Sequence, residues 1–192
     1  MASLEDAPYV HADDHATWRA WLEANHAVAR GAWLVTWRSR SGRPGLDYEA
    51  AIEEALCFGW VDSTGGRFDD ARGKLYFAPR TPRSPWAATN KARVARLIAE
   101  GRMAPAGLAA IERAKVNGSW GVLDSAARLE VPEDLAAALE IHPPAAANFA
   151  AFPPSARRML LGWVALARRP ETRAARISRV AEAAARNERA RG

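Results

Sequence analysis

The segments with a strand-like pattern all lie within the first 80 positions of this 192-residue chain, and this asymmetry most constrains how it can fold. The run Ala32–Trp37 is rich in strand-forming residues, and Trp60–Thr64 and Lys74–Pro79 are similar. After Asp124, prolines divide an alanine-rich sequence into short helical segments. We predict an α+β fold: a small antiparallel sheet of about three strands packed with helices, followed by an all-helical part.

The same asymmetry predicts two parts, an α+β domain over residues 1–123 and a C-terminal helical module over residues 124–192, packed together as one compact unit. Within the first part we expect a helix from Asp13 or Asp14 to about Ala29 and another over residues 48–58. A third is predicted over residues 84–100, because Ser84 can cap a helix and proline is favoured at the first helical position.

The composition excludes several classes of protein. Hydrophobic residues make up 49% of the chain, enough for a core, but no apolar run approaches the roughly 18 residues of a membrane span. The first ten residues carry no basic region and do not resemble a signal peptide. A lone cysteine, Cys57, cannot form an internal disulfide. We therefore expect a cytoplasmic protein with a buried thiol.

No sequence motif indicates a cofactor or a metal. The four histidines lack metal-ligand spacing, and there is no phosphate-binding loop, dinucleotide fingerprint or Gly-x-Ser-x-Gly motif. The chain is thus expected to hold no cofactor and no metal, and its residues favour a non-enzymatic role without settling it.

Two short segments form a candidate ligand site. Trp60 and Asp62 are two apart on a predicted strand, so their side chains should share a face. An acid beside an aromatic ring can have a raised pKa and act as a proton donor or acceptor. The alternative, which we favour, is that Asp62 caps a turn or pairs with an arginine.

The second segment holds Arg80, Arg83, Trp86, Asn90 and Lys91. If a helix begins at Ser84, its N-terminus beside two arginines suits a phosphate or carboxylate. Trp86 and Asn90 would then lie four apart on one helix face. The alternative is that the arginines form structural ion pairs and Trp86 packs in the core.

The net charge of +5 comes mostly from the C-terminal tail, where residues 155–192 hold ten arginines and three acids. Arg169, Arg173, Arg176 and Arg179 could line one helix face and bind phosphates of a nucleic acid. No aromatic residue interleaves with them in the sequence, so base stacking is not indicated and a solvated face is the favoured interpretation.

Five segments in order resemble the YdeI/OmpD-associated family, also described as bacteriocin-protection proteins. They are Trp21-Leu22 with Asn25-His26, Ala55 to Asp62, Pro79 to Trp86 with Asn90-Lys91, Gly101 to Gly107, and Ser155 to Ile177. The resemblance implies a role in tolerance of bacteriocins or antimicrobial peptides and association with an outer-membrane porin. It implies no catalytic residues.

Three functions are therefore consistent with the sequence. The resemblance favours a non-enzymatic protein of bacterial stress tolerance, with a protein partner. The residues Trp60, Asp62 and Arg80 to Lys91 suit instead a protein or enzyme that binds a small anionic ligand. The arginine-rich tail would suit a nucleic-acid-associated protein, the least favoured of the three.

Overall fold

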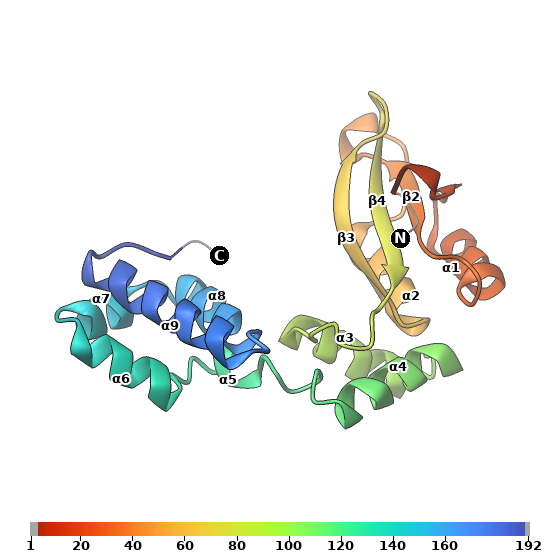
Figure 1. Ribbon diagram of the computed structural model, residues 1–192. Coiled ribbons are helices and arrows are strands. Elements are labelled where there is room, and N and C mark those ends of the chain that lie inside the picture. The colour runs from red at the N-terminus through yellow and green to blue at the C-terminus, as the bar shows by residue number, and fades with distance from the viewer. Residues whose placement is uncertain (1–3, 191–192) are drawn as a thin grey trace. The chain divides into compact units, whose positions relative to one another are not determined.

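The computed structural model describes residues 4–190, which form two compact units (Figure 1). One unit contains the chain up to Ser84 together with Thr89–Ser119, and the other contains Pro85–Ala88 together with the chain from Trp120 onward. The first three residues of the N-terminal segment considered above, and the last two of the arginine-rich tail, lie outside the described residues. The predicted α+β class is confirmed, whereas the packing of the two parts on each other stays a prediction.

The sheet of the α+β unit has the strand order β1-β2-β4-β3. The predicted strands are present as β2 (Ala32–Trp37), β3 (Trp60–Arg67) and β4 (Arg72–Pro79), and these pair antiparallel. A further strand, β1 (Tyr9–His11), pairs parallel with β2, so the sheet is mixed rather than wholly antiparallel. The parallel pair is possible because a helix, α1 (His15–Asn25), lies between the two strands in the sequence.

β3 also extends further than expected. We predicted that Gly65-Gly66 would stop it, but the strand continues to Arg67 and its pairing with β4 shifts register between Asp62 and Gly65. Such an irregularity absorbs an extra residue while the ladder continues. The glycines therefore mark a bulge within the strand and not its end.

The first two helices begin where aspartates cap them. Asp14 Oδ1 accepts a 2.7 Å hydrogen bond from Thr17 N at the start of α1, and Asp47 Oδ1 accepts one of 2.8 Å from Ala50 N at the start of α2 (Tyr48–Cys57). α1 packs on the sheet through Trp18, whose ring lies 5.3 Å from that of Phe77. α1 ends at Asn25, four residues earlier than predicted.

α3 (Ala88–Ala99) and α4 (Pro105–Val116) complete the α+β unit. α4 approaches the end of α2 with backbone against backbone: a Cβ atom on Gly107 would lie 2.2 Å from Cys57 O. Gly59, which follows α2, has a φ of +74°, a conformation that favours glycine. Two glycines thus fix how α2 turns into β3 beneath α4.

The other unit is a bundle of short helices: α5 (Asp124–Ala127), α6 (Glu133–Ile141), α7 (Ala145–Ala151), α8 (Pro154–Ala165) and α9 (Pro170–Ala185). Its core includes Leu135, Phe149, Leu160 and Val180, all almost fully buried. Prolines at the first positions of α8 and α9 start these helices. The predicted helical C-terminal part is confirmed.

Candidate functional site

Trp60 and Asp62 lie at the start of β3 and play different parts. Trp60 is buried and meets Trp21 of α1 edge to face, with ring centroids 5.8 Å apart. Asp62 is half-buried, and its Oδ2 accepts a 2.9 Å hydrogen bond from the hydroxyl of Tyr48. Burial raises the pKa of Tyr48, and the hydrogen bond to Asp62 raises it further. The partner of Asp62 is therefore Tyr48, a residue that the sequence did not indicate as part of the site.

Arg80 follows β4 directly and is buried, with 8% of its surface exposed. Its backbone N–H donates a 2.9 Å hydrogen bond to Gly59 O, which anchors it beside the start of β3. Burial lowers the pKa of Arg80 to about 10, and the negative charge of Asp62 acts in the opposite direction. Tyr48, Asp62 and Arg80 form a polar group that we call the Tyr48 cluster.

The helix predicted to begin at Ser84 is wrong, because α3 begins at Ala88. Ser84 N donates instead to Thr81 O at 3.0 Å, and the hydroxyls of these two residues lie 2.8 Å apart. The groups expected to cap a helix close a turn instead. The helix N-terminus that was expected at Ser84, directly after Arg83, therefore begins four residues later in the sequence.

Trp86 and Asn90 do not share a helix face, contrary to our prediction. Trp86 precedes α3, is buried in the helical unit and lies 5.1 Å from the ring of Trp120. Asn90 stands in the first turn of α3 and accepts a 2.7 Å hydrogen bond from Arg93, which also binds both carboxylate oxygens of Glu49 at 2.6 Å. Asn90 thus helps to join α3 to α2.

The remaining two predicted residues are Arg83 and Lys91, one before α3 and one within it. Arg83 is exposed in the connection before α3, and Lys91 is half-buried in the first turn of the helix. Of the seven predicted ligand-binding residues, the structure brings Asp62 and Arg80 together in the Tyr48 cluster. Whether any of them binds a ligand stays a prediction.

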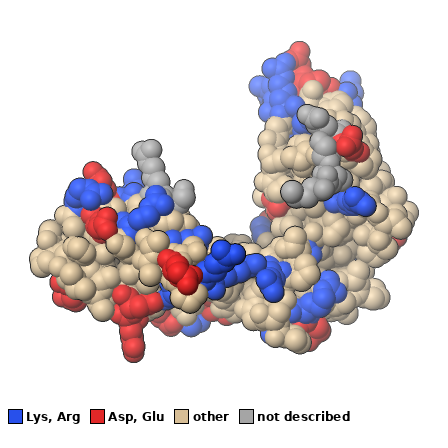
Figure 2. Space-filling view, in the orientation of Figure 1, with Lys and Arg blue, Asp and Glu red and all other residues tan. Residues whose placement is uncertain are grey.

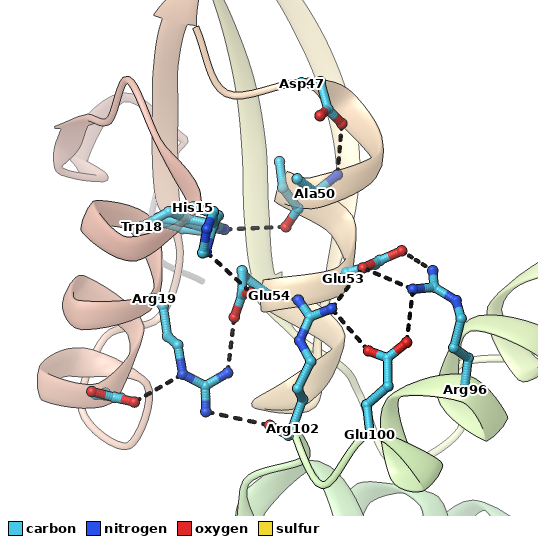
Figure 3. Close-up of polar contacts among 12 residues, drawn as sticks. His15, Trp18, Arg19, Asp47, Ala50, Glu53, Glu54, Arg96, Glu100 and Arg102 are labelled. Carbon is cyan, nitrogen blue, oxygen red and sulfur yellow. Dashed lines mark hydrogen bonds and ion pairs between the residues drawn. The ribbon is translucent and has the colours of Figure 1, made fainter.

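The most extensive polar network of the α+β unit was not predicted at all (Figure 3). Glu53 and Glu54 on α2 are 6% and 2% exposed, yet arginines from three other segments reach them. Arg19 of α1 donates to Glu54 at 2.9 Å, Arg96 of α3 pairs with Glu53, and Arg102 binds Glu53 at 3.1 Å and Glu54 at 2.6 Å. We call this the α2 carboxylate cluster.

Electrostatics suit this cluster to a structural role. Burial alone would lower the pKa of Arg102, but hydrogen bonds to Glu54 and Glu100 outweigh it and raise that pKa. Burial also raises the pKa of the neighbouring Cys57 thiol, and the charge of Glu54 adds to the effect. Arg102 stays charged and the Cys57 thiol stays protonated at neutral pH, which suits a cluster that ties helices together.

A sequence signal for this cluster existed. Glu53 and Glu54 stand side by side in a helix that is otherwise apolar from Ala51 to Cys57. Buried carboxylates require partners, so the pair implied cations on neighbouring elements. Which arginines supply them, however, depends on how α1 and α3 pack on α2.

A cleft of about 460 Å³ opens between the sheet and the segment that leads into α2. Its walls include Leu34, Thr36, Leu46 and Tyr48. Tyr48 is 58% exposed, so its ring stands in the wall of the cleft while its hydroxyl reaches Asp62. Of the Tyr48 cluster, Tyr48 itself thus lines a cavity large enough for a small ligand, whereas Asp62 and Arg80 are not among the residues of its walls.

Three of the four tail arginines make contacts within the helical unit. Arg173 binds both carboxylate oxygens of Asp134 on α6, at 2.6 and 2.9 Å. Arg176 donates to Trp163 O, and the guanidinium groups of Arg176 and Arg179 lie 5.0 and 5.3 Å from the centre of the Trp163 ring. Arg169 precedes α9 as its N-cap. A nucleic-acid role for these arginines stays a prediction.

Residues 4–190 hold no group of three or more His, Cys, Asp or Glu side chains that could bind a metal ion. None of their helices combines the length and apolar character that a membrane crossing requires.

Two family models match different parts of the chain, and the boundary of the units at Trp120 falls in the stretch between the two matches. Residues 10–110, from β1 into α4, match the model of a domain of unknown function, DUF8412. Residues 128–187, which include α6 to α9, match the model described as bacteriocin-protection, YdeI or OmpD-associated. No curated protein and no solved structure matches the chain. The chain therefore belongs to the DUF8412 family, and residues 128–187 of its helical unit match the YdeI/OmpD-associated model, the family that the resemblance named.

Proposed function

We propose that the chain is a non-enzymatic cytoplasmic protein of bacterial stress tolerance, which protects against bacteriocins or antimicrobial peptides by binding a cationic amphipathic peptide. The observation that carries this proposal is a groove of about 440 Å³ between α6 and α9, within the matched bacteriocin-protection domain. Ala138, Ile141 and Ile177 line it, and Ile141 is 73% exposed.

The charge beside this groove complements such a peptide. Residues 124–140 hold five acids and one arginine. Acidic side chains gather over α6 in the space-filling view (Figure 2), and Glu133 and Glu140 of that helix are exposed. Antimicrobial peptides commonly present Lys and Arg on one helix face and apolar residues on the other. An apolar groove beside an acidic helix suits both faces.

The test combines binding with survival. Purified full-length protein is titrated with a cationic antimicrobial peptide by calorimetry, and a strain lacking the gene is challenged with the same peptide. We expect Ile141→Glu and Glu140→Lys to weaken binding at least about tenfold and to fail to restore survival. Asp13→Lys, a matched charge reversal at an exposed position of the α+β unit, should behave as wild type.

Two results would reject the proposal. If the strain lacking the gene and the complemented strain survived the peptide equally well, the protein would have no role in tolerance. If Asp13→Lys weakened peptide binding as much as Glu140→Lys, the binding would depend on net charge and not on the groove.

A second candidate function rests on the Tyr48 cluster. Burial lowers the pKa of Arg80, so a bound anion would stabilise its charged form. The cleft beside Tyr48 offers access for a small carboxylate or phosphate. We expect anions to raise the melting temperature of the wild type but not of the double variant Arg80→Ala, Arg83→Ala. Arg113→Ala, which removes an exposed arginine from α4, is the control; equal anion-induced shifts in all three proteins would exclude this function.

A further inference from the structure

The sheet carries a row of aromatic rings and cations on the face turned away from α1. Side chains alternate between the two faces of a strand, and Phe77 faces α1. Tyr76, Lys74 and Arg72 therefore lie on the opposite face of β4. The register places them beside Trp33, Val35 and Trp37 of β2, and Tyr9 of β1 lies beside Trp33.

These side chains form a continuous series, which we call the aromatic–cation ladder. Two guanidinium groups lie near the ring of Trp37, that of Arg43 at 4.5 Å and that of Arg72 at 5.6 Å from the ring centre. Arg72 also lies 4.9 Å from the Phe68 ring, which is 5.3 Å from the Tyr9 ring. Lys74 Nζ then lies between Tyr9 and Trp33, at 5.2 and 4.4 Å from their ring centres.

The ladder is accessible and retains positive charge. Tyr9 is 46% exposed, and Trp37, Phe68 and Lys74 are half-buried. Asp69 pairs with Arg72 at 2.6 Å, but neither Lys74 nor Arg43 forms an ion pair with a carboxylate in the described part of the chain. Gly66 of β3 pairs with Lys74, and a Cβ atom there would meet nothing within 4 Å. Space is therefore open beside the lysine.

We infer that this face binds single-stranded nucleic acid. Bases of any sequence can stack on exposed rings, while cations beside them contact the phosphates. Here Tyr9, Phe68 and Trp37 supply the rings, Lys74 and Arg43 supply cations for phosphates, and Arg72 holds its place between two rings. An acidic protein surface would contact only the cations, and an aliphatic surface would contact only the rings. A nucleic acid strand alternates aromatic bases with charged phosphates, as the ladder alternates rings with cations.

The ladder is separate from the groove of the helical unit and from the arginines of α9, whereas two of its members, Trp37 and Lys74, also line the cleft beside Tyr48. Its members come from three strands, the β3–β4 connection and the segment after β2, all in the α+β unit. Acidic and basic side chains also gather where the β3–β4 hairpin turns (Figure 2), at one end of this face.

The test is fluorescence anisotropy of the full-length protein with labelled oligo(dT) and oligo(U) of about 12 nucleotides, and with a duplex of the same length. We expect both single strands to bind more tightly than the duplex. The ratio of the affinities for oligo(dT) and oligo(U) shows whether the face prefers DNA or RNA. With about two phosphates contacted, a fourfold rise in salt should weaken binding about sevenfold. Trp37→Ala should weaken it about 5- to 150-fold, while Trp37→Phe, which keeps a stacking ring, should restore most of the affinity.

Charge variants separate this face from the rest of the protein. Lys74→Ala should reduce the slope of log affinity against log salt by about 0.7. Arg113→Ala on α4 removes the same charge from an exposed position and should leave the slope unchanged. Circular dichroism melts confirm that each variant is folded. Binding that persists in Trp37→Ala and Lys74→Ala, prefers the duplex, or is lost in Arg179→Ala instead would overturn the inference.

Discussion

Arg102, in the connection between α3 and α4, donates a 2.6 Å hydrogen bond to Oε1 of Glu54 on α2, 48 residues earlier in the chain. Arg19 of α1 reaches the other carboxylate oxygen of Glu54 at 2.9 Å. One buried carboxylate thus ties three separate segments together, and we expect the α+β unit to be sensitive to mutation of the α2 carboxylate cluster.

Glu54→Gln should lower the free energy of unfolding by about 3 kcal/mol, because breaking a buried ion pair leaves charged partners without compensation. Chemical denaturation followed by circular dichroism measures the loss. Glu100→Gln is the matched control, since Glu100 contacts Arg102 at 3.2 Å but is 38% exposed, and its loss should cost about 1 kcal/mol or less. Equal losses in the two variants would contradict a buried role for Glu54.

Asp134→Asn should destabilise the helical unit at neutral pH but not in acid. The hydrogen bonds from Arg173 hold the pKa of Asp134 below its usual value of 3.8. A lowered pKa stabilises the fold at pH values above 3.8, and this contribution disappears as the pH falls through the folded-state pKa. Because Asp134 is 46% exposed, the difference at pH 7 should be about 1 kcal/mol or less.

The measurement compares urea denaturation of Asp134→Asn and wild type across the acid range. Glu140→Gln removes a charge from the same helix at an exposed position and should show no such pH-dependent gap. A gap between Asp134→Asn and wild type that persists unchanged at pH values well below 3.8 would contradict the assignment.

Gly107→Ala should destabilise the α+β unit by about 1–3 kcal/mol, the usual range for overpacking. The added Cβ would lie 2.2 Å from Cys57 O, and backbone cannot move aside as a flexible side chain can. Thermal melting provides the measurement. Gly66→Ala, whose Cβ would meet nothing within 4 Å, should leave the melting temperature nearly unchanged.

Cys57 should be unreactive in the native protein. It is fully buried, and burial raises the pKa of its thiol above the ordinary value of 9.0, which suppresses the reactive thiolate. A chromogenic disulfide reagent added at mildly alkaline pH should react with Cys57 only after denaturant is added. Rapid reaction with the native protein would show that α2 is not packed as described.

Local signals predicted the parts of the fold that depend on neighbouring residues. The predicted helix starts at Asp13 or Asp14 and at residue 48 agree with α1 and α2, because the capping aspartates Asp14 and Asp47 act within one turn of their own positions. Ser84 was misread for the same reason: its capping groups were visible, but their use in a turn with Thr81 was not. β1 was missed because three residues carry too little pattern to identify a strand.

The site was harder to predict because its members meet only through long-range packing. Asp62 and Arg80 were both predicted as candidate ligand-binding residues, yet Tyr48, which binds Asp62, lies on a helix that gave only an apolar pattern. The ladder shows the same limit. Tyr9, Trp37 and Phe68 look unrelated in the sequence, and strand register alone brings them together.

The chain enters the helical unit at Pro85–Ala88, returns to the α+β unit, and enters the helical unit again at Trp120. The bacteriocin-protection domain, matched over residues 128–187, therefore sits in a unit that also holds Trp86, whose ring lies against Trp120. A gene fragment cut before Trp120 would encode all five helices and still lack that ring. We therefore expect a fragment that begins at Trp120 to be less stable than the helical unit with Trp86 in place.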